Sequence, residues 1–402
     1  MKNVAILGFG TVGSGVYEML CQNAEKIEKA LGFPIKVKYI LDIRDFSDRD
    51  DAHIFTKDFN VILEDSEIDI IAEVIGGVHP AYDFTKAALL AGKSVVTSNK
   101  ELVAKKGCEL LKIAKENNIN YLFEASVGGG IPLINPVHNC LAANKIEEIG
   151  GILNGTTNYI LTEMFEKGRT FDEALKNAQE LGYAERNPEA DVEGIDACRK
   201  ISILMSLITG KFCDSEKIHT EGITKIDEKD VAYAEKLDSV IKLVAYGKNT
   251  EDGIFAAVAP AMIKNENPLS SVRSVFNAAY VKGNAVGKVM FYGRGAGKMP
   301  TASAVVADIF DVAKSSDNKG YFWEEEGSFI PFEKMKESYF VRIAKKDEAK
   351  AKSLFYEDAF CCLSEEDDEF AVITPLMENG LFEETFKDIC VIKRIRIVGE
   401  DE

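Results

Sequence analysis

The sequence predicts an α/β protein made of a parallel-sheet domain, an α+β domain and a small C-terminal βαββαβ domain. Short apolar runs alternate with segments of helical period over about residues 1–130, which is typical of a parallel sheet covered by helices. Pro132 and Pro136 then interrupt this pattern. Near the C-terminus the order of elements is that of the ferredoxin-like split unit. The expected domains are residues 1–133, 134–313 and 331–402.

The first domain is expected to alternate strands and helices throughout. Strands are expected at residues 4–7, 37–41, 69–75, 94–97 and 121–123, and helices at 16–31, 84–91 and 103–117. Each βαβ unit returns the chain to the carboxyl edge of the sheet, where ligands of such folds bind. Motifs at the ends of these strands therefore carry the functional prediction.

The later domains mix strands and helices in a less regular order. The second is expected to contain strands at residues 145–153, 254–262, 280–286 and 288–292, and helices at 158–167, 170–181, 195–209, 269–278 and 301–313. Residues 314–330 are largely polar and predict a linker. The third is expected to contain strands at residues 339–343, 360–363, 370–374 and 392–398, and helices at 347–354 and 380–389.

Composition excludes several classes of protein. A net charge of −18 disfavours a nucleic-acid partner, because phosphates are repelled before any base can be contacted. The N-terminus lacks the features of a signal peptide, and no apolar run reaches the roughly 18 residues of a membrane-spanning helix. The eight cysteines form no CxxC pair, and the four histidines form no zinc motif. We expect a soluble cytoplasmic protein with reduced thiols, most of them in the core, and with neither a nucleic-acid nor a membrane partner.

A glycine-rich turn follows the first expected strand and precedes a helix. In this context a GxGxxG pattern predicts a Rossmann dinucleotide-binding domain, because the glycines allow a tight turn, close approach of a pyrophosphate and close packing of the helix. The helix N-terminus adds free N–H groups for the phosphates. The alternative is a structural turn without a ligand. The six residues are Gly8, Phe9, Gly10, Thr11, Val12 and Gly13.

The end of the second expected strand carries residues of both signs. Asp42 suits the free 2′-hydroxyl of NAD, whereas Arg44 suits the 2′-phosphate of NADP. The residues therefore leave the cofactor open between NAD and NADP. Charged residues that merely end a strand are the alternative.

Three further motifs fall at strand ends, at residues 73–77, 98–100 and 124–132. Lys100 is placed where the nicotinamide of a bound cofactor reaches, although a solvated surface lysine is the ordinary alternative. The triple glycine within 124–132 exposes backbone carbonyls that can hold a hard cation or admit a ligand. A flexible loop is the competing interpretation.

Residues 181–200 combine many charges with the start of an apolar helix. Asp196 and Lys200 are four apart, so a helix places them on one face, where they can pair. The alternative is an ordinary surface salt bridge. The apolar residues around them indicate a largely buried helix, in which a charge needs a partner or a purpose.

These motifs, taken together, resemble those of the homoserine dehydrogenase family. The most specific are residues 151–161 (GILNGTTNYIL) and 181–200 (LGYAE through DVEGIDACRK), and residues 293–306 add GRGAG followed by PTASAVV. The resemblance covers about residues 1–313 in the family's order. It implies NAD(P)-dependent interconversion of L-homoserine and L-aspartate 4-semialdehyde, a step in threonine, methionine and isoleucine biosynthesis.

The resemblance also implies roles for single residues. Glu185 and Asp191 hold the substrate, with Glu185 at its ammonium end. Lys100 and Lys200 flank the reacting oxygen, and Asp196 orients Lys200. In reduction Lys200 gives a proton to the oxygen, and in oxidation it accepts one, so its pKa has to be low enough to cycle.

A cofactor surface, a cation and an oligomer are implied as well. Gly297 resembles the position that returns to the cofactor, so the following helix is expected to pack on the Rossmann domain, and the other implied cofactor contacts are Arg44, Thr97, Ser98 and Lys100. A monovalent cation, usually sodium, is expected at Glu124, Val127, Gly129 and Ile131, largely on main-chain oxygens. A homodimer formed through the sheets of the substrate domain is expected.

The sequence departs from the family in two places. Asn187 stands before Pro188 where an acidic residue is usual, which we expect to change the loop and not the chemistry. The C-terminal domain resembles a regulatory ACT domain by its order of elements only, since its first helix is short and lacks a glycine-containing ligand turn, and the acidic run 364–369 replaces the usual connection. Feedback inhibition by threonine is therefore not expected.

Two rival functions differ in what they require of the chain. Another Rossmann oxidoreductase on amino acids, such as an aspartate dehydrogenase, does not explain residues 181–200. A dinucleotide sensor does not need Lys100, Lys200 and Asp196 together. An assay of homoserine oxidation with NAD⁺ and NADP⁺ side by side separates all three.

Overall fold

A computed structural model describes residues 1–315, 317–318, 320–356, 359–364 and 367–398. By its contacts the chain divides into two compact units, each assembled from three segments. Unit 1 is Met1–Ile146, Ser202–Glu216 and Ala279–Gly327, and unit 2 is Glu147–Ile201, Lys217–Ala278 and Ser328–Glu402. Among the described residues no helix is long and apolar enough to cross a membrane.

Unit 1 contains a six-stranded parallel sheet of order β3-β2-β1-β4-β5-β6, which confirms the predicted parallel-sheet domain. The chain leaves β1 toward β2 and later returns to the other side of β1 as β4, so the strand order reverses between β1 and β4. This reversal is where such sheets bind ligands. The elements are β1 (Lys2–Leu7), α1 (Thr11–Gln22), α2 (Ala24–Leu31), β2 (Ile35–Leu41), β3 (Phe55–Thr56), α3 (Phe59–Leu63), β4 (Ile68–Glu73), α4 (Ala81–Leu90), β5 (Ser94–Thr97), α5 (Lys100–Glu116) and β6 (Tyr121–Leu122).

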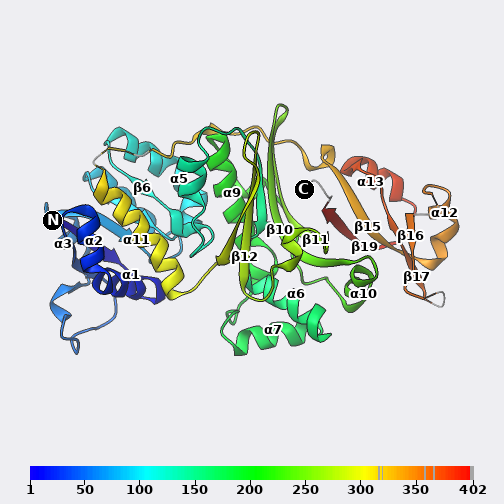
Figure 1. The fold of residues 1–402 in the computed structure, drawn as a ribbon, viewed down its shortest axis with the longest axis horizontal. Helices are drawn as coiled ribbons and strands as arrows, with labels where there is room; N and C mark the ends of the chain where they lie inside the picture. The colour runs from blue at the N-terminus through cyan, green and yellow to red at the C-terminus, as the bar shows by residue number, and fades with distance from the viewer. Residues whose placement is uncertain (316, 319, 357–358, 365–366, 399–402) are drawn as a thin grey trace. The chain divides into compact units, whose positions relative to one another are not determined.

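The helical segment predicted over residues 16–31 is two helices, α1 and α2, separated at Asn23. Helix α11 (Lys298–Lys314), drawn in yellow in Figure 1, packs on α1. Gly15 permits this approach, because a Cβ atom there would lie 2.9 Å from the Lys298 carbonyl oxygen. Lys298 also pairs with Glu18 on α1, with 2.6 Å between Nζ and Oε2. A helix far along the chain is therefore part of unit 1.

The predicted linker over residues 314–330 is in part a packed segment. Its strand β14 (Glu324–Glu326) pairs with β8 (Lys211–Phe212). Trp323 is only 3% exposed, and its ring lies where a Cβ atom on Gly107 of α5 would be 2.4 Å away. The prediction of a linker is wrong for this part, because its buried aromatic rings outweigh the polar composition on which the prediction rested.

An 11-stranded mixed sheet has the order β13-β12-β7-β10-β11-β19-β15-β17-β16, with β18 and β9 off this path. The chain passes from one unit to the other within β7, within α9 and within β12. Up to β13, the strands of this sheet and the helices between them are, in chain order, β7 (Ile146–Ile152), α6 (Gly155–Lys167), α7 (Phe171–Glu180), α8 (Glu189–Val192), α9 (Ile195–Thr209), β9 (His219–Thr220), α10 (Glu228–Lys236), β10 (Ser239–Thr250), β11 (Gly253–Lys264), β12 (Phe276–Gly283) and β13 (Gly287–Arg294).

The helix predicted over residues 269–278 is wrong. Only one 3₁₀ turn forms, Pro268–Ser271, and β12 begins at Phe276. The physical reason is Asn158 on α6, whose side-chain amide donates to the carbonyl oxygens of Val272, Ser274 and Phe276 and holds that stretch in a turn, with Ser274 at a φ of 56°. Strand β10 and helix α10 were not expected from the sequence, although β10 forms a long antiparallel hairpin with β11.

The C-terminal segment has the predicted order β15-α12-β16-β17-α13-β19. Its strands lie in the order β19-β15-β17-β16 with antiparallel neighbours, and β19 also pairs with β11 in parallel, so this part belongs to the larger sheet of unit 2. The predicted acidic run 364–369 lies partly outside the described residues. The elements are β15 (Lys336–Ala344), α12 (Glu348–Lys352), β16 (Phe360–Cys361), β17 (Glu369–Ile373), β18 (Met377–Glu378), α13 (Asn379–Phe386) and β19 (Val391–Val398).

A buried ion cluster fastens the C-terminal strands to the rest of unit 2. Arg342 on β15 is 3% exposed and donates to Asp227 and Asp230 at the start of α10 and to Glu369 of β17. Three carboxylates around one guanidinium satisfy most of its donors, which a buried arginine requires.

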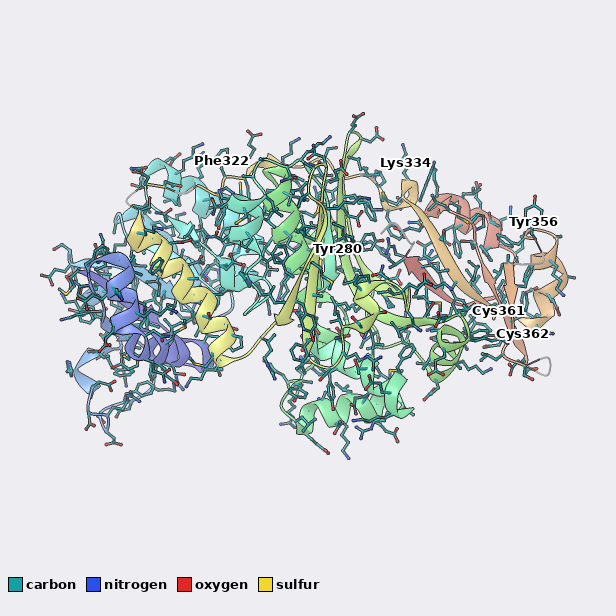
Figure 2. All side chains as sticks on the ribbon, in the orientation of Figure 1. Tyr280, Phe322, Lys334, Tyr356, Cys361 and Cys362 are labelled. Carbon is teal, nitrogen blue, oxygen red and sulfur yellow. The ribbon has the colours of Figure 1, made fainter. Side chains whose placement is uncertain are left out.

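All cysteines are free thiols, but most are not core residues as predicted. Cys198 and Cys213 are buried, whereas the others are exposed or intermediate. Figure 2 labels Cys361 and Cys362 at the edge strand β16, next to each other in the chain.

Candidate functional site

The glycine turn lies at the carboxyl end of β1, at the strand reversal. Gly8 has a φ of 98°, and a Cβ atom on Gly13 would lie 1.9 Å from the Gly8 carbonyl oxygen, so both positions require glycine. Gly10 is the N-cap of α1 and makes no side-chain cap. Nothing lies within 4 Å of a Cβ atom built on Gly10, so the space beside it is open. A ligand phosphate can approach the backbone there.

Asp42 and Arg44 form one structure with this turn. The Phe9 amide donates to Asp42 Oδ2 at 2.8 Å, and Arg44 donates through Nε and NH2 to the two Asp42 oxygens at 2.9 and 2.8 Å. The Arg44 guanidinium holds the pKa of Asp42 well below its usual range. The guanidinium of Arg49 also lies 5.3 Å from the centroid of the Phe9 ring. Two arginines therefore flank the position that reads the ribose.

A buried carboxyl group organises the ends of β4 and β5. Glu73 is fully buried, accepts from the Thr97 hydroxyl at 2.7 Å and from the Ile75 amide at 2.8 Å, and its pKa is raised by burial. Thr97 in turn accepts from the Asn99 amide, and Asn99 caps α5, whose first residue is Lys100. The Thr97 hydroxyl therefore faces inward and shapes the turn that presents Lys100.

The loop at residues 124–131 is buried except at Gly130, so its interpretation as a flexible loop is wrong. The Glu124 carboxylate accepts from the amides of Leu133, Ile134 and Asn135 at 2.6, 2.9 and 2.5 Å. Burial raises the pKa of Glu124, while these three donors act in the opposite direction. The side chain of Glu124 is thus occupied in holding the following turn.

The main-chain oxygens of the same loop suit a cation. Val127, Gly129 and Ile131 are buried, and within the described part of the chain their carbonyl oxygens accept no backbone hydrogen bond. Buried carbonyl groups are nearly always paired, so a ligand is the natural partner. Gly129 fits tightly, because a Cβ atom there would lie 2.3 Å from the Gly295 carbonyl oxygen. The donor set therefore fits a hard cation bound by main-chain oxygens.

In unit 2 the predicted pair of Asp196 and Lys200 forms on α9. Lys200 Nζ lies 2.6 Å from Asp196 Oδ2, and the two side chains are 9% and 5% exposed. The Leu153 carbonyl oxygen also accepts from Lys200 Nζ, at 2.7 Å. The alternative of an ordinary surface salt bridge is wrong, because both charges are buried and the lysine is held from two sides.

Asn154, to which the sequence assigned no role, joins Asp191 to this pair. The Asn154 amide donates to Asp191 Oδ1 at 2.7 Å and to Asp196 Oδ2 at 2.9 Å. Glu185, by contrast, is exposed, and its backbone carbonyl accepts from Gln179. The structure therefore gathers Asp191, Asp196 and Lys200 and leaves Glu185 on the surface of the same segment.

The predicted site residues fall into two groups, one in each unit. Unit 1 holds the glycine turn, Arg44, the turn before Lys100, the loop 124–131 and Gly297, which is exposed and precedes α11. Unit 2 holds Glu185, Asp191, Asp196 and Lys200.

Several residues of both groups were missed. Glu73 and Asn154 lie inside motifs that the sequence analysis quoted. Their roles follow only from their hydrogen bonds to residues distant in the sequence, Thr97 for Glu73 and Asp196 for Asn154. Thr156 donates its hydroxyl to the Tyr183 carbonyl at 2.7 Å and ties the start of α6 to the segment before Glu185. An asparagine before Gly-Thr-Thr at a helix start was the available signal for Asn154, as an N-cap.

Two family models match most of the chain. A family model described as "Homoserine dehydrogenase" matches residues 132–310, and one described as "Homoserine dehydrogenase, NAD binding domain" matches residues 8–124. The homoserine dehydrogenase of Neisseria gonorrhoeae is 37% identical over 402 residues, which cover 97% of this chain and 91% of that protein.

Solved structures give the same result. The chain resembles a homoserine dehydrogenase from Thiobacillus denitrificans with a TM-score of 0.89 at 35% identity, covering 99% of this chain and 98% of that one. A hyperthermophilic archaeal homoserine dehydrogenase solved in complex with NADPH matches with a TM-score of 0.67 at 31% identity, covering 78% of this chain and 98% of that one.

Proposed function

The chain belongs to the homoserine dehydrogenase family, and from that premise we propose which of its residues carry out the reaction. It is an NAD(P)-dependent oxidoreductase that interconverts L-homoserine and L-aspartate 4-semialdehyde. The bound nicotinamide supplies or accepts the hydride. The protein has to hold a zwitterionic substrate, move one proton at its oxygen and exclude water.

Lys200 is the proton-transfer residue in this proposal. In reduction its ammonium donates a proton to the carbonyl oxygen and stabilises the developing negative charge, and in oxidation the amine accepts the hydroxyl proton. The observation that carries this role is the buried contact of Lys200 with Asp196 and the Leu153 carbonyl, because two acceptors fix the amine in one position. Lys100, at the N-terminus of α5, acts as the second lysine at the reacting oxygen.

The substrate ammonium is assigned to Glu185, with Asp191 as a second carboxylate. Asp191 is partly exposed and is oriented by Asn154, which supports a role in holding the cationic group of the substrate. The side chain of Glu185 is exposed and, unlike that of Asp191, is not held by Asn154. We propose that it contacts the substrate ammonium when substrate binds.

One assay tests the function. Reduction of NAD⁺ and of NADP⁺ by the purified full-length chain is followed with homoserine as the only oxidisable substrate, and the reverse reaction with aspartate 4-semialdehyde. We expect turnover in both directions with at least one cofactor. Tight cofactor binding without turnover of homoserine would contradict the proposal.

The cofactor site is proposed to accept both dinucleotides, with Arg44 deciding the balance. NADP carries a 2′-phosphate that pairs with a guanidinium, while Asp42 accepts from a free 2′-hydroxyl and repels a phosphate. The Phe9 amide fixes Asp42 at the turn, so Arg44 has to release Asp42 before it can pair with a phosphate.

Arg44→Ala is expected to raise the KM for NADP⁺ by at least about 10-fold, since a charge-assisted contact is worth about 1.5–3 kcal/mol, and to leave the KM for NAD⁺ within about twofold. Both values come from the homoserine oxidation assay. Lys36→Ala is the matched control, because it removes an exposed positive charge from β2 far along the strand from Asp42. Equal changes with both cofactors would exclude the specificity role.

A monovalent cation, sodium, is proposed to bind the carbonyl oxygens of Val127, Gly129 and Ile131, with Glu124 holding the loop in shape. When bound, the ion supplies the missing partners of buried oxygens, and it would rigidify the loop that packs under the chain before α11.

Replacing sodium by tetramethylammonium, which is too large for such a site, is expected to lower the thermal midpoint by several degrees and to reduce turnover. The reason is linkage: an ion that binds only the folded state stabilises it. Differential scanning fluorimetry and the oxidation assay are run at matched ionic strength. Identical behaviour in the two salts would remove the cation from the proposal.

The remaining proposals concern assembly. We propose a homodimer formed through the mixed sheet, a cytoplasmic location that suits the free thiols, and a C-terminal ACT-like domain, supported by the antiparallel order β19-β15-β17-β16. Analytical ultracentrifugation tests the dimer.

A further inference from the structure

Asn154 lies between Asp191, proposed to hold the substrate, and Asp196, proposed to orient the proton-transfer lysine. It lies at the N-cap of α6, directly after Leu153, and is 4% exposed. Its Oδ1 accepts from the Thr157 amide at 2.8 Å and from the Thr157 hydroxyl at 3.0 Å, while its Nδ2 donates to Asp191 and Asp196. Both ends of the amide are therefore in use.

The orientation of this amide follows from its neighbours. Two carboxylates need donors and the Thr157 amide needs an acceptor, so only one arrangement of oxygen and nitrogen satisfies all three. The reverse arrangement would place Oδ1 against two carboxylates. The donor end of Asn154 is thus fixed toward Asp191 and Asp196.

Leu153, the residue before Asn154, also contacts Lys200. The Leu153 carbonyl accepts from Lys200 Nζ, and Asp196 Oδ2 accepts from both Lys200 and Asn154. Asp191 and Asp196, two like charges, meet at one Nδ2 group, which offsets their repulsion because it donates to both. Removing this donor would let the carboxylates move apart and change the position of Lys200.

We propose that Asn154 is a positioning residue that links the substrate-holding Asp191 to the proton-transfer pair of Asp196 and Lys200. The inference rests on the roles proposed above for those three residues. In this proposed role Asn154 does not contact the reacting atoms. It sets the distance between the carboxylate that receives substrate and the carboxylate that orients the lysine.

The first test is Asn154→Ser. Serine caps a helix about as well as asparagine, so α6 keeps its cap, but its short hydroxyl cannot serve Thr157 and both carboxylates. We expect kcat to fall about 10- to 100-fold, as for other partners that orient reacting groups, and the KM for homoserine to rise. The KM for the cofactor should not change, because the glycine turn lies in unit 1.

The second test is Asn154→Asp, which keeps the size and the cap but replaces the donor by a carboxyl group. Above its pKa the added carboxylate repels Asp191 and Asp196, and below it the added carboxylic acid donates one hydrogen bond in place of the amide. The activity of this variant relative to wild type is therefore expected to rise as pH falls toward 6. A residue that only caps α6 gives no such pH dependence.

Asn177→Asp is the matched control. Asn177 on α7 also donates to a carboxylate, Glu163, in unit 2, and to the Tyr159 hydroxyl, and among the described residues these are the partners of its side-chain amide. We expect wild-type kcat, KM and pH dependence.

The outcomes separate this inference from the proposed function. Wild-type kinetics and pH dependence in both Asn154 variants, with only a lower thermal midpoint, would overturn the positioning role and leave the function intact. A wild-type chain without homoserine turnover, or a Lys200 variant with full turnover, would instead contradict the function itself.

Discussion

Lys200→Ala is expected to lower kcat for homoserine oxidation by about 10³-fold, within the range for loss of a general acid-base group. The structure holds Lys200 between Asp196 and the Leu153 carbonyl, and both accept from its amine. The effect is measured as initial rates at saturating homoserine and cofactor, together with the cofactor Kd. Cofactor binding should be retained, because the glycine turn is in the other unit.

A second substitution separates chemistry from folding. Lys200→Ala leaves Asp196 buried without its cation, which destabilises a protein by about 3–5 kcal/mol. Lys200→Arg keeps the positive charge near Asp196 but cannot release a proton, because a guanidinium is always protonated in proteins. We expect Lys200→Arg to fold and still to lose at least about 10²-fold in kcat for oxidation.

The control for both variants is Lys176→Ala, which removes an exposed lysine from α7 in the same unit. It should keep wild-type kinetics. A near-normal kcat in Lys200→Arg would show that proton transfer runs through another group.

Gly13→Ala and Gly10→Ala are expected to affect the cofactor site by two different routes. A Cβ atom on Gly13 would lie 1.9 Å from the Gly8 carbonyl oxygen and 2.9 Å from its carbon, so the turn itself has to move. We expect dinucleotide binding to be lost and the thermal midpoint to fall. The backbone fixes the position of a Cβ atom and the Gly8 carbonyl is itself backbone, so neither can rotate away as the far end of a side chain can.

Gly10→Ala reports on the ligand and not on the fold. Gly10 has a φ of −75° and nothing within 4 Å of a built Cβ atom, so alanine fits without strain in the free protein. We expect an unchanged thermal midpoint but a cofactor Kd raised at least about 10-fold, because the new methyl group occupies the space that a pyrophosphate needs. The Kd is measured by quenching of NADPH or NADH fluorescence. Wild-type binding in Gly10→Ala would mean that the phosphates do not approach this turn.

The sequence determined those features that depend on local backbone geometry. Alternating apolar runs predicted the parallel sheet, and the spacing of the glycines at residues 8–13 predicted where the chain turns tightly. The spacing of Asp196 and Lys200 placed them on one face of a helix, where the structure finds them paired. Helical and strand periods are properties of neighbouring residues, so they can be read without knowing the fold.

The errors and omissions share a different cause. The expected helix at residues 269–278 failed because Asn158, from α6, takes the carbonyl oxygens that a helix would use. The expected linker contains Trp323, whose buried position depends on the space above Gly107 of α5. In both cases a residue distant in the sequence outweighs the local preference, and only packing brings the two together.

The same limit applied to the site. The sequence named Asp191 and Asp196 without relating them to each other, although it paired Asp196 with Lys200, and it left the loop 124–131 open between a flexible loop and a cation site. Only the tertiary structure decided that Asn154 joins the first two and that the loop is buried with main-chain oxygens lacking backbone partners. The physical reason is that hydrogen-bond geometry across tens of residues is set by how helices and strands pack, and no periodicity encodes it.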